Sequence, residues 1–355
     1  MTEHRKQPPE FAQGSAGADL TPFLGTLLDG RTLTVDETTS AFEAMMTGEV
    51  HHGEMGALLA LLATRLPTPD ELEGAARVMR RHVTRVESDL PADEILDTAG
   101  TGGAPKTFNV STAAALVAAG AGVNVAKHGN RSRTGRGSAE ALQSIGINVE
   151  AGPETQARCL EQAGICFCFA IHHHPATRHV MPVRKAMGVP TIFNLLGPLT
   201  NPANAGRQLM GVWDGRYQKP VAEALNHLGT RRALIVHSDD GLDELSISAP
   251  STVFEVRDGD VSSWRISPED VGLETVGIDL VTARDLDHAT EMMKSVIDGR
   301  EQGPARDMTL LNAAAALLAC DRVEDMKQGV QVAARSIDDG NAMASLEKLA
   351  RISNG

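Results

Sequence analysis

Residues 97–138 read DTAGTGGAPKTFNVSTAAALVAAGAGVNVAKHGNRSRTGRGS and contain the most informative pattern of the chain. Two glycine-rich turns, residues 100–103 and 127–132, each follow a short apolar segment and precede a helical pattern. Glycine lets backbone N–H groups approach an anion closely, and a following helix N-terminus adds partial positive charge. Two such turns, with a lysine and several hydroxyl groups, predict a ligand that carries more than one phosphate group.

Both turns belong to a series of short apolar segments that predict strands. These segments are residues 95–97, 123–126, 146–149, 165–169 and 233–237. They alternate with helical patterns, which favours a parallel sheet with helices on both faces. Ligands of such sheets bind beyond the carboxyl ends of the strands, where both turns begin. Residues 252–266 alternate like an antiparallel hairpin, and further helices are expected at about 306–319 and 324–350.

The N-terminal part has a purely helical pattern. Residues 1–18 are polar and predict a disordered tail, whereas apolar residues recur at helical spacing through residues 19–90. Thr34 and Asp36 indicate one helix start, and Thr68 followed by a proline indicates another. We therefore expect an α/β protein with a small all-helical N-terminal domain and a larger α/β domain whose central sheet is mainly parallel.

The composition and charge of the chain argue against nucleic acids and membranes as partners. The formal net charge of −13 disfavours a nucleic-acid partner, because such a surface needs a concentrated basic face. No apolar run approaches the roughly 18 residues of a membrane span, so no membrane partner is expected. The four cysteines show neither a C-x-x-C pair nor a zinc spacing, and are read as buried thiols of a reducing, cytoplasmic environment.

Asp243 and Glu244 follow the strand predicted at residues 233–237 through a short turn. Mg²⁺ prefers one or two carboxylates together with water and substrate phosphates. Alone, this pair would be read as a solvated acidic loop, which is common in an acidic protein. At the same sheet edge as two phosphate-binding turns, it favours a magnesium site.

The basic residues near the turns leave alternatives open. Lys127 lies between an apolar strand and a glycine turn, which favours an anion partner over a solvated lysine. His128 is either a substrate contact or a satisfied turn histidine. His172, His173, His174 and His179 lack a complementary acidic or cysteine set, so histidines facing a polar cleft are favoured over a transition-metal site. Arg184 is either a carboxylate clamp or a surface arginine.

Five segments together resemble one enzyme family, the anthranilate phosphoribosyltransferases of tryptophan biosynthesis. They are residues 97–112, 127–132, 181–184, 193–202 and 243–244, and the resemblance extends over about residues 20–350. The resemblance implies a cytoplasmic homodimer with Mg²⁺ as cofactor and with phosphoribosyl pyrophosphate and anthranilate as substrates. It also implies that residues 184–204 return to the helical domain (residues 19–90), leaving residues 91–183 and 205–355 for the α/β domain.

The resemblance also assigns the site residues. Those implied for phosphoribosyl pyrophosphate are Gly100, Thr101, Gly102, Gly103, Thr107, Asn109, Ser111, Thr112, Lys127 and Ser138. Those implied for anthranilate are Gly100, His128, Asn130, His174 and Arg184. Those implied for the metal are Ser111, Asp243 and Glu244. The amine of anthranilate is itself the nucleophile, so no catalytic serine or cysteine is expected.

Two positions depart from the family pattern. Ala104 stands where an aspartate is usual, which removes a carboxylate from the ribose and pyrophosphate neighbourhood. The loop at residues 133–137 is basic and shorter where serines are usual, so Arg133 and Arg136 could replace serine hydrogen bonds to phosphate.

Two other functions remain open at this stage. One is a pyrimidine-nucleoside phosphorylase of the same architecture, which would release a free base. The other is a non-catalytic, nucleic-acid-binding relative, against which the acidic pair and the net charge of −13 both speak.

Overall fold

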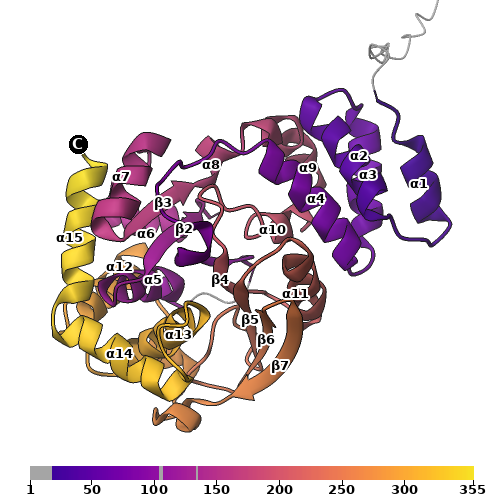
Figure 1. The fold of residues 1–355 in the computed structure, drawn as a ribbon. Coiled ribbons are helices and arrows are strands. Elements are labelled where there is room, and N and C mark those ends of the chain that lie inside the picture. Colours follow the sequence, from indigo (N-terminus) through magenta and orange to yellow (C-terminus); the bar gives the residue numbers. More distant parts are fainter. Residues whose placement is uncertain (1–17, 104–106, 133–134) are drawn as a thin grey trace, which may run out of the picture.

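A seven-stranded sheet forms the centre of the larger domain in the computed structural model, which describes residues 18–103, 107–132 and 135–355 (Figure 1). The strands are β1 (Ile95–Gly100), β2 (Asn124–Gly129), β3 (Ile165–Phe169), β4 (Arg207–Gly211), β5 (Arg232–Ser238), β6 (Ser251–Arg257) and β7 (Asp260–Ile266). Their order is β3-β2-β1-β4-β5-β6-β7; β1 to β5 are mutually parallel, and β6 and β7 form an antiparallel hairpin. The predicted fold class is confirmed, and the predicted tail lies, except for residue 18, outside the described residues.

Two strand predictions were wrong. Residues 146–149 form no strand but the turn between α6 (Ser138–Ser144) and α7 (Pro153–Ala163), where Gly146 has a φ of +90°. Ile147 and Val149 are apolar because both are buried against the core, not because they extend a sheet. The central strand β4 was missed, because an arginine and a glutamine begin it.

Four helices form the N-terminal bundle: α1 (Thr21–Leu28), α2 (Val35–Thr47), α3 (His52–Ala63) and α4 (Pro69–Arg81). Thr34 and Thr68 each cap their helix reciprocally with a glutamate three residues later. Such caps satisfy backbone N–H groups that a helix start leaves unpaired. The predicted helix starts are therefore confirmed.

A later segment packs against this bundle. It contains the short helices α8 (Ala170–His173), α9 (Met181–Met187) and α10 (Phe193–Leu196). The rings of Phe42 and Phe193 lie 5.5 Å apart, and Arg80 Nε donates to the Leu199 carbonyl over 2.8 Å. α9 contacts α3 and α10 contacts α4 at the bundle side of the molecule (Figure 1), so the chain crosses back to the bundle after β3.

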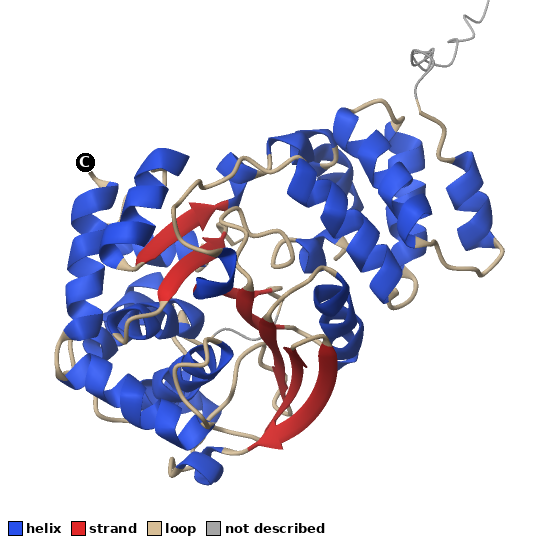
Figure 2. Cartoon of the chain, viewed as in Figure 1, coloured by secondary structure: helices blue, strands red, loops and turns tan. Residues whose placement is uncertain are grey.

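Helices lie on both sides of the sheet (Figure 2), and the sheet separates two apolar cores. One face packs against α5 (Val110–Gly120), α7, α12 (Leu286–Ile297), α13 (Pro304–Ala319), α14 (Met326–Asp338) and α15 (Asn341–Ser353). The other face packs against α11 (Gln218–His227) and shares its core with the bundle. Leu209 and Met210 point into opposite cores, as the alternation of a strand requires.

The C-terminal helices differ from expectation in one respect. The single helix expected at about 324–350 is two helices, α14 and α15, which separate at Gly340 with a φ of +75°. Within residues 18–103, 107–132 and 135–355, no helix is long and apolar enough to cross a membrane.

Candidate active site

The first glycine turn follows β1 and is anchored to the end of β4. Gly102 and Gly103 have φ values of +66° and +100°, a left-handed conformation that side chains disfavour. The backbone N–H of Thr101 donates to the Gly211 carbonyl over 3.0 Å, and its hydroxyl accepts from the Trp213 N–H over 3.1 Å. The turn is thereby held at the carboxyl edge of the sheet, whereas Ala104 lies outside the described residues.

The acidic pair reaches this turn from the loop after β5. A Cβ placed on Gly100 would lie 3.0 Å from Asp243 Oδ2, and one placed on Gly211 would collide with the Asp243 carbonyl. Glu244 Oε2 accepts a hydrogen bond from the Thr107 hydroxyl over 3.0 Å. The structure therefore brings Asp243 against Gly100 and Glu244 against Thr107, which both lie more than 130 positions earlier in the sequence.

The donor atoms at this edge suit a hard cation. Asp243 and Glu244 offer carboxylate oxygens, and Ser111, in the first turn of α5, offers a hydroxyl. Mg²⁺ takes oxygen ligands and keeps positions for water and phosphate oxygens. These residues thus fit the ion in chemistry, and the close approach of Asp243 to Gly100 leaves the carboxylate facing the turn.

Lys127 lies beneath the site instead of projecting from it. Its side chain is buried on β2, and its ammonium donates to the Thr98 carbonyl over 2.5 Å, to the Thr98 hydroxyl over 3.3 Å and to Ser111 Oγ over 3.2 Å. Burial lowers the pKa of Lys127 to about 8, against the opposing attraction of Asp97 and Glu244. The Lys127 ammonium is therefore linked to the site through its hydrogen bond to the Ser111 hydroxyl.

Side-chain hydrogen bonds link the start of α5 to the basic loop that follows the second glycine turn. Asn109 directly precedes α5, and its side-chain amide donates to the Arg136 carbonyl over 3.3 Å, while Arg136 Nη1 donates to the Ala283 carbonyl over 2.6 Å. Ser138 begins α6, and its hydroxyl occupies the space that a Cβ on Gly129 would need. Arg133, proposed above as a phosphate contact, lies outside the described residues.

Thr112 differs from the other hydroxyl residues. Its side chain is 1 % exposed, and its Oγ1 has no hydrogen-bond partner among the described residues. A buried hydroxyl of this kind is uncommon, because its desolvation is not compensated.

His128 and His174 form a buried pair. Their Nε2 atoms are 3.3 Å apart and their ring centroids 5.1 Å apart. Burial lowers the pKa of both imidazoles, that of His174 to about 4; His174 and His173 lower the pKa of His128 further, and His173 lowers that of His174. Both are therefore neutral at physiological pH.

The other histidines do not gather into a metal site. Both ring nitrogens of His173 are used, by the Thr84 carbonyl at 2.7 Å and by Gln156 Oε1 at 2.8 Å. His172 contacts Glu150 at the surface. Within the described residues His172 and His173 thus serve separate contacts, and the expectation that the histidines face a polar cleft was wrong for these two.

The remaining residues assigned to anthranilate lie on separate elements. Asn130 is exposed just after β2, where its Oδ1 accepts from the Arg131 N–H over 2.8 Å. Arg184 is half-buried on α9, with its guanidinium 5.1 Å from the centre of the Phe193 ring. Burial lowers the pKa of Arg184. A cation over an aromatic ring is held in place without its charge being neutralised.

Two residues of the site were not assigned from the sequence. Asp97 is 1 % exposed, its Oδ1 accepts from the His128 N–H over 3.0 Å, and burial raises its pKa to about 6. Trp213 lies against the turn, with its Cβ 3.5 Å from the position of a Cβ on Gly103. Recognition of β4 would have indicated Trp213, because the residue follows the carboxyl end of a central strand.

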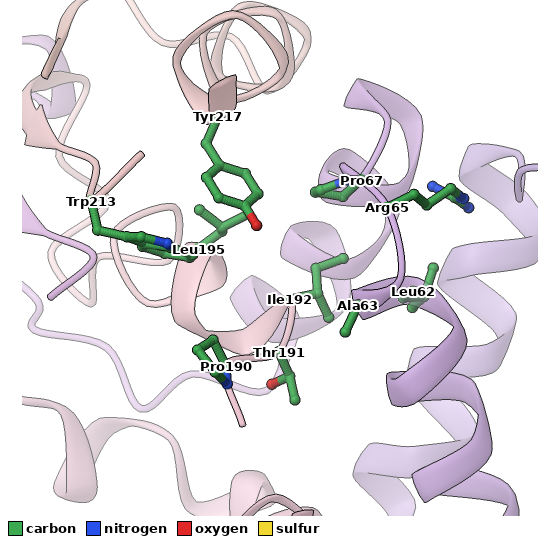
Figure 3. A pocket seen from close by; sticks show the side chains of 10 residues that line it. All are labelled: Leu62, Ala63, Arg65, Pro67, Pro190, Thr191, Ile192, Leu195, Trp213 and Tyr217. Carbon is green, nitrogen blue, oxygen red and sulfur yellow. The ribbon is translucent and has the colours of Figure 1, made fainter. Parts of the chain in front are cut away.

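A small cavity of about 30 Å³ lies where the bundle, the returning segment and the α/β domain meet (Figure 3). Trp213 and Tyr217 line it, with ring centroids 4.6 Å apart, and Leu195 lies beside them, whereas Ile192 lies nearer to Ala63. That volume suits a water molecule or two, not a substrate. Trp213 thus contacts both this junction and the glycine turn.

Comparison with known proteins agrees with this geometry. Residues 92–343 match the glycosyl transferase family a/b domain, and residues 21–83 match the helical bundle domain of the same family. The anthranilate phosphoribosyltransferase of Symbiobacterium thermophilum is 47% identical over 328 residues, which are 92% of this chain and 95% of that protein. That of Thioalkalivibrio sulfidiphilus is 46% identical over 89% of this chain and 94% of that protein.

Solved structures give the same result. The anthranilate phosphoribosyltransferase of Thermus thermophilus superposes with a TM-score of 0.88 at 37% identity, covering 94% of this chain and 99% of that one. The Saccharomyces cerevisiae enzyme in complex with PRPP and Mg has a TM-score of 0.84 at 27% identity, covering 94% and 98%. The resemblance drawn from the sequence is confirmed, and this chain belongs to the anthranilate phosphoribosyltransferase family.

Proposed function

We propose that this chain transfers the phosphoribosyl group of phosphoribosyl pyrophosphate to the amine of anthranilate and releases pyrophosphate, a step of tryptophan biosynthesis. The observation that carries the proposal is the approach of the Asp243 carboxylate to Gly100 in the glycine turn after β1. Relatives from Saccharomyces cerevisiae are described in complex with PRPP and Mg and with 4-fluoroanthranilate. The alternatives, a nucleoside phosphorylase and a nucleic-acid-binding relative, gain no comparable support.

The phosphate groups would occupy the two glycine turns. Backbone N–H groups of residues 100–103 and the N-terminus of α5 would contact the pyrophosphate, with the hydroxyl of Ser111 beside it. Ser138, at the N-terminus of α6, would lie beside the second turn. Lys127 would act through its charge and through Ser111, because its three ammonium hydrogens already have acceptors.

The metal would be held by Asp243, Glu244 and the Ser111 hydroxyl. When bound, Mg²⁺ neutralises charge on the pyrophosphate oxygens and so makes pyrophosphate a better leaving group. Ala104, outside the described residues, removes a carboxylate from this neighbourhood, and the remaining pair must therefore supply the protein's negative charge toward the ion.

Anthranilate would lie between the histidine pair and Arg184. A planar guanidinium binds a carboxylate well, and Arg184 is already oriented by the Phe193 ring. His128, His174 and Asn130 would face the rest of the substrate. The bond from ribose carbon 1 to pyrophosphate breaks as the bond to the amine nitrogen forms, and the amine then releases one proton.

Catalysis would depend on position and charge, with no covalent enzyme intermediate. Holding two substrates in line supplies roughly 7–11 kcal/mol when the geometry is ideal. Preorganised backbone amides and the Lys127 ammonium would stabilise the charge that develops on the departing pyrophosphate, and the acidic pair would hold the ion that assists them.

Three further features belong to the proposal. Residues 184–204 would form part of the helical domain, as their contacts with the bundle through Phe193 and Leu199 support. The enzyme would be a homodimer and would work in the cytoplasm. Sedimentation velocity tests the dimer directly, because a chain of 37.6 kDa sediments distinctly from its dimer.

One assay tests the function. Phosphoribosyl pyrophosphate, Mg²⁺ and anthranilate are mixed with the protein, and the loss of anthranilate fluorescence is followed with the release of pyrophosphate. The proposal predicts that both occur at equal rates and stop when EDTA is added. Release of a free base from a pyrimidine nucleoside and phosphate, without anthranilate consumption, would establish the phosphorylase instead.

A further inference from the structure

Residues 196–199, between α10 and β4, form what we call the carbonyl strap. Each of its four consecutive backbone carbonyls accepts a hydrogen bond from a side chain, and three of the donors come from other elements. The pairs are Thr200 Oγ1 to Leu196 at 2.9 Å, His128 Nδ1 to Gly197 at 3.0 Å, Gln208 Nε2 to Pro198 at 2.6 Å and Arg80 Nε to Leu199 at 2.8 Å. The strap therefore ties α4, β2 and β4 together at the histidine pair.

The strap determines where the proton of His128 lies. A carbonyl oxygen only accepts hydrogen bonds, so the bond to Gly197 requires a hydrogen on His128 Nδ1. In a neutral ring, Nε2 then carries a lone pair. His174 Nε2, 3.3 Å away, must be the donor across the pair. His174 Nδ1 is thereby left as a hydrogen-bond acceptor.

We propose that the strap selects the Nδ1–H tautomer of His128 and that Gln208 is a positioning residue for this selection. Gln208 lies on β4, is 4 % exposed and holds the carbonyl next to that of Gly197. Without the Gln208 amide, the Pro198 carbonyl would have no side-chain donor. The strap would then move to regain one, because a buried carbonyl without a donor is costly. The Gly197 carbonyl would move with it.

The consequence for the reaction rests on the proposed function. With this arrangement of protons, the pair is an uncharged acceptor of hydrogen bonds. The pair accepts a hydrogen bond from the substrate amine and does not attract the substrate carboxylate. The Arg184 cation attracts the carboxylate and cannot accept a hydrogen bond from the amine. The strap would thereby determine the orientation in which the aromatic substrate binds between the histidine pair and Arg184.

The chain offers a matched control for Gln208. Gln218, at the start of α11, is also a buried glutamine, and its Nε2 donates to the carbonyls of Ile235 and Thr252 over 2.8 and 2.7 Å. The substitutions Gln208→Leu and Gln218→Leu each remove a buried side-chain amide that donates to backbone carbonyls. Only the first concerns the strap.

The experiment combines ¹⁵N NMR of histidine-labelled protein with steady-state kinetics. Protonated and unprotonated imidazole nitrogens resonate in separate ranges, and the His128→Gln variant identifies the His128 signals by their loss. In the wild type we expect His128 to be protonated on Nδ1. In the Gln208→Leu variant we expect both tautomers of His128 to be present. We also expect kcat/KM for anthranilate to fall about 10- to 100-fold in Gln208→Leu, with KM for phosphoribosyl pyrophosphate unchanged. Gln218→Leu should keep both the tautomer and the kinetics.

Two results would overturn the proposal: a hydrogen on His128 Nε2 in the wild type, or equal tautomer spectra and kinetics in the two leucine variants. If Gln208→Leu does not fold, Thr200→Val replaces it and Thr200→Ser, which keeps the hydroxyl, must restore the wild-type spectrum. The NMR result is independent of turnover, so a wild type without transferase activity but with the Nδ1–H tautomer would refute the function and leave the strap's role standing.

Discussion

Asp243 Oδ2 lies 3.0 Å from the point that a Cβ on Gly100 would occupy. This approach joins the turn after β1 to the loop after β5, which are separated by β4 in the sheet. The absence of a side chain at residue 100 is therefore what allows the carboxylate to face the phosphate-binding turn.

Gly100→Ala should displace the Asp243 carboxylate and weaken metal-dependent turnover. Because small displacements at a reacting centre are costly, we expect kcat/KM to fall about 10-fold or more, with a higher Mg²⁺ concentration needed for half-maximal rate. Gly152→Ala is the control, since no atom lies within 4 Å of its added Cβ. Equal activity of the two variants would show that the approach has no functional role.

Asp243→Ala/Glu244→Ala should abolish most of the turnover, by about 10²- to 10³-fold, because charge on the leaving pyrophosphate is no longer stabilised. The matched control is Asp93→Ala/Glu94→Ala, which removes the same charge from exposed residues at the opposite end of β1. Initial rates of anthranilate consumption measure both. Near-normal activity of the first double variant would refute the metal assignment.

His174→Gln should make the protein less sensitive to acid. The pKa of His174 falls from 6.5 to about 4 on folding, so between these pH values the unfolded chain binds a proton that the folded chain does not. The contribution of His174 to the free energy of unfolding is therefore complete above pH 6.5 and falls by about 3 kcal/mol as the pH falls to 4. Gln cannot titrate, and urea unfolding at several pH values should show a correspondingly smaller loss.

The comparison must be made between variants at the same pH, because Asp97 acts in the opposite direction. The pKa of Asp97 rises from 3.8 to about 6 on folding, so its contribution to the free energy of unfolding grows as the pH falls through that range.

Trp213 should report ligand binding to the glycine turn. The chain has two tryptophans, so Trp264→Phe leaves Trp213, which contacts Gly103, as the single indole. Phosphoribosyl pyrophosphate with Mg²⁺ should shift its emission. Trp213→Phe leaves Trp264, whose Nε1 donates to Glu255 on the β6–β7 hairpin, and its emission should stay constant. A response from Trp264 alone would place the ligand elsewhere.

The sequence predicted those parts of the fold whose signals are local. Thr34 and Thr68 indicated helix starts because capping depends on neighbours three residues away. The turns after β1 and β2 were recognisable because glycine clusters between apolar segments have few other uses. β4 was not recognisable, because its central place comes from pairing with β1 and β5, and its own sequence begins with an arginine and a glutamine.

The site followed the same division. That Asp243 belongs beside the first turn could be predicted, since both follow parallel strands. The inward position of Lys127 could not, because it depends on the carbonyl of Thr98 and the hydroxyl of Ser111. The carbonyl strap was equally hidden: residues 193–202 were recognisable as a family motif, but their backbone bonds to Arg80, His128 and Gln208 exist only in the folded chain.

Diffraction from crystals soaked with phosphoribosyl pyrophosphate and Mn²⁺, an anomalous scatterer in place of Mg²⁺, is the most direct test of the acidic pair and the glycine turn acting as one site. We predict an anomalous peak within coordination distance of Asp243 or Glu244, with pyrophosphate density on the N–H groups of residues 100–103. Sugar density remote from Gly100, or a metal peak away from both carboxylates, would contradict the account.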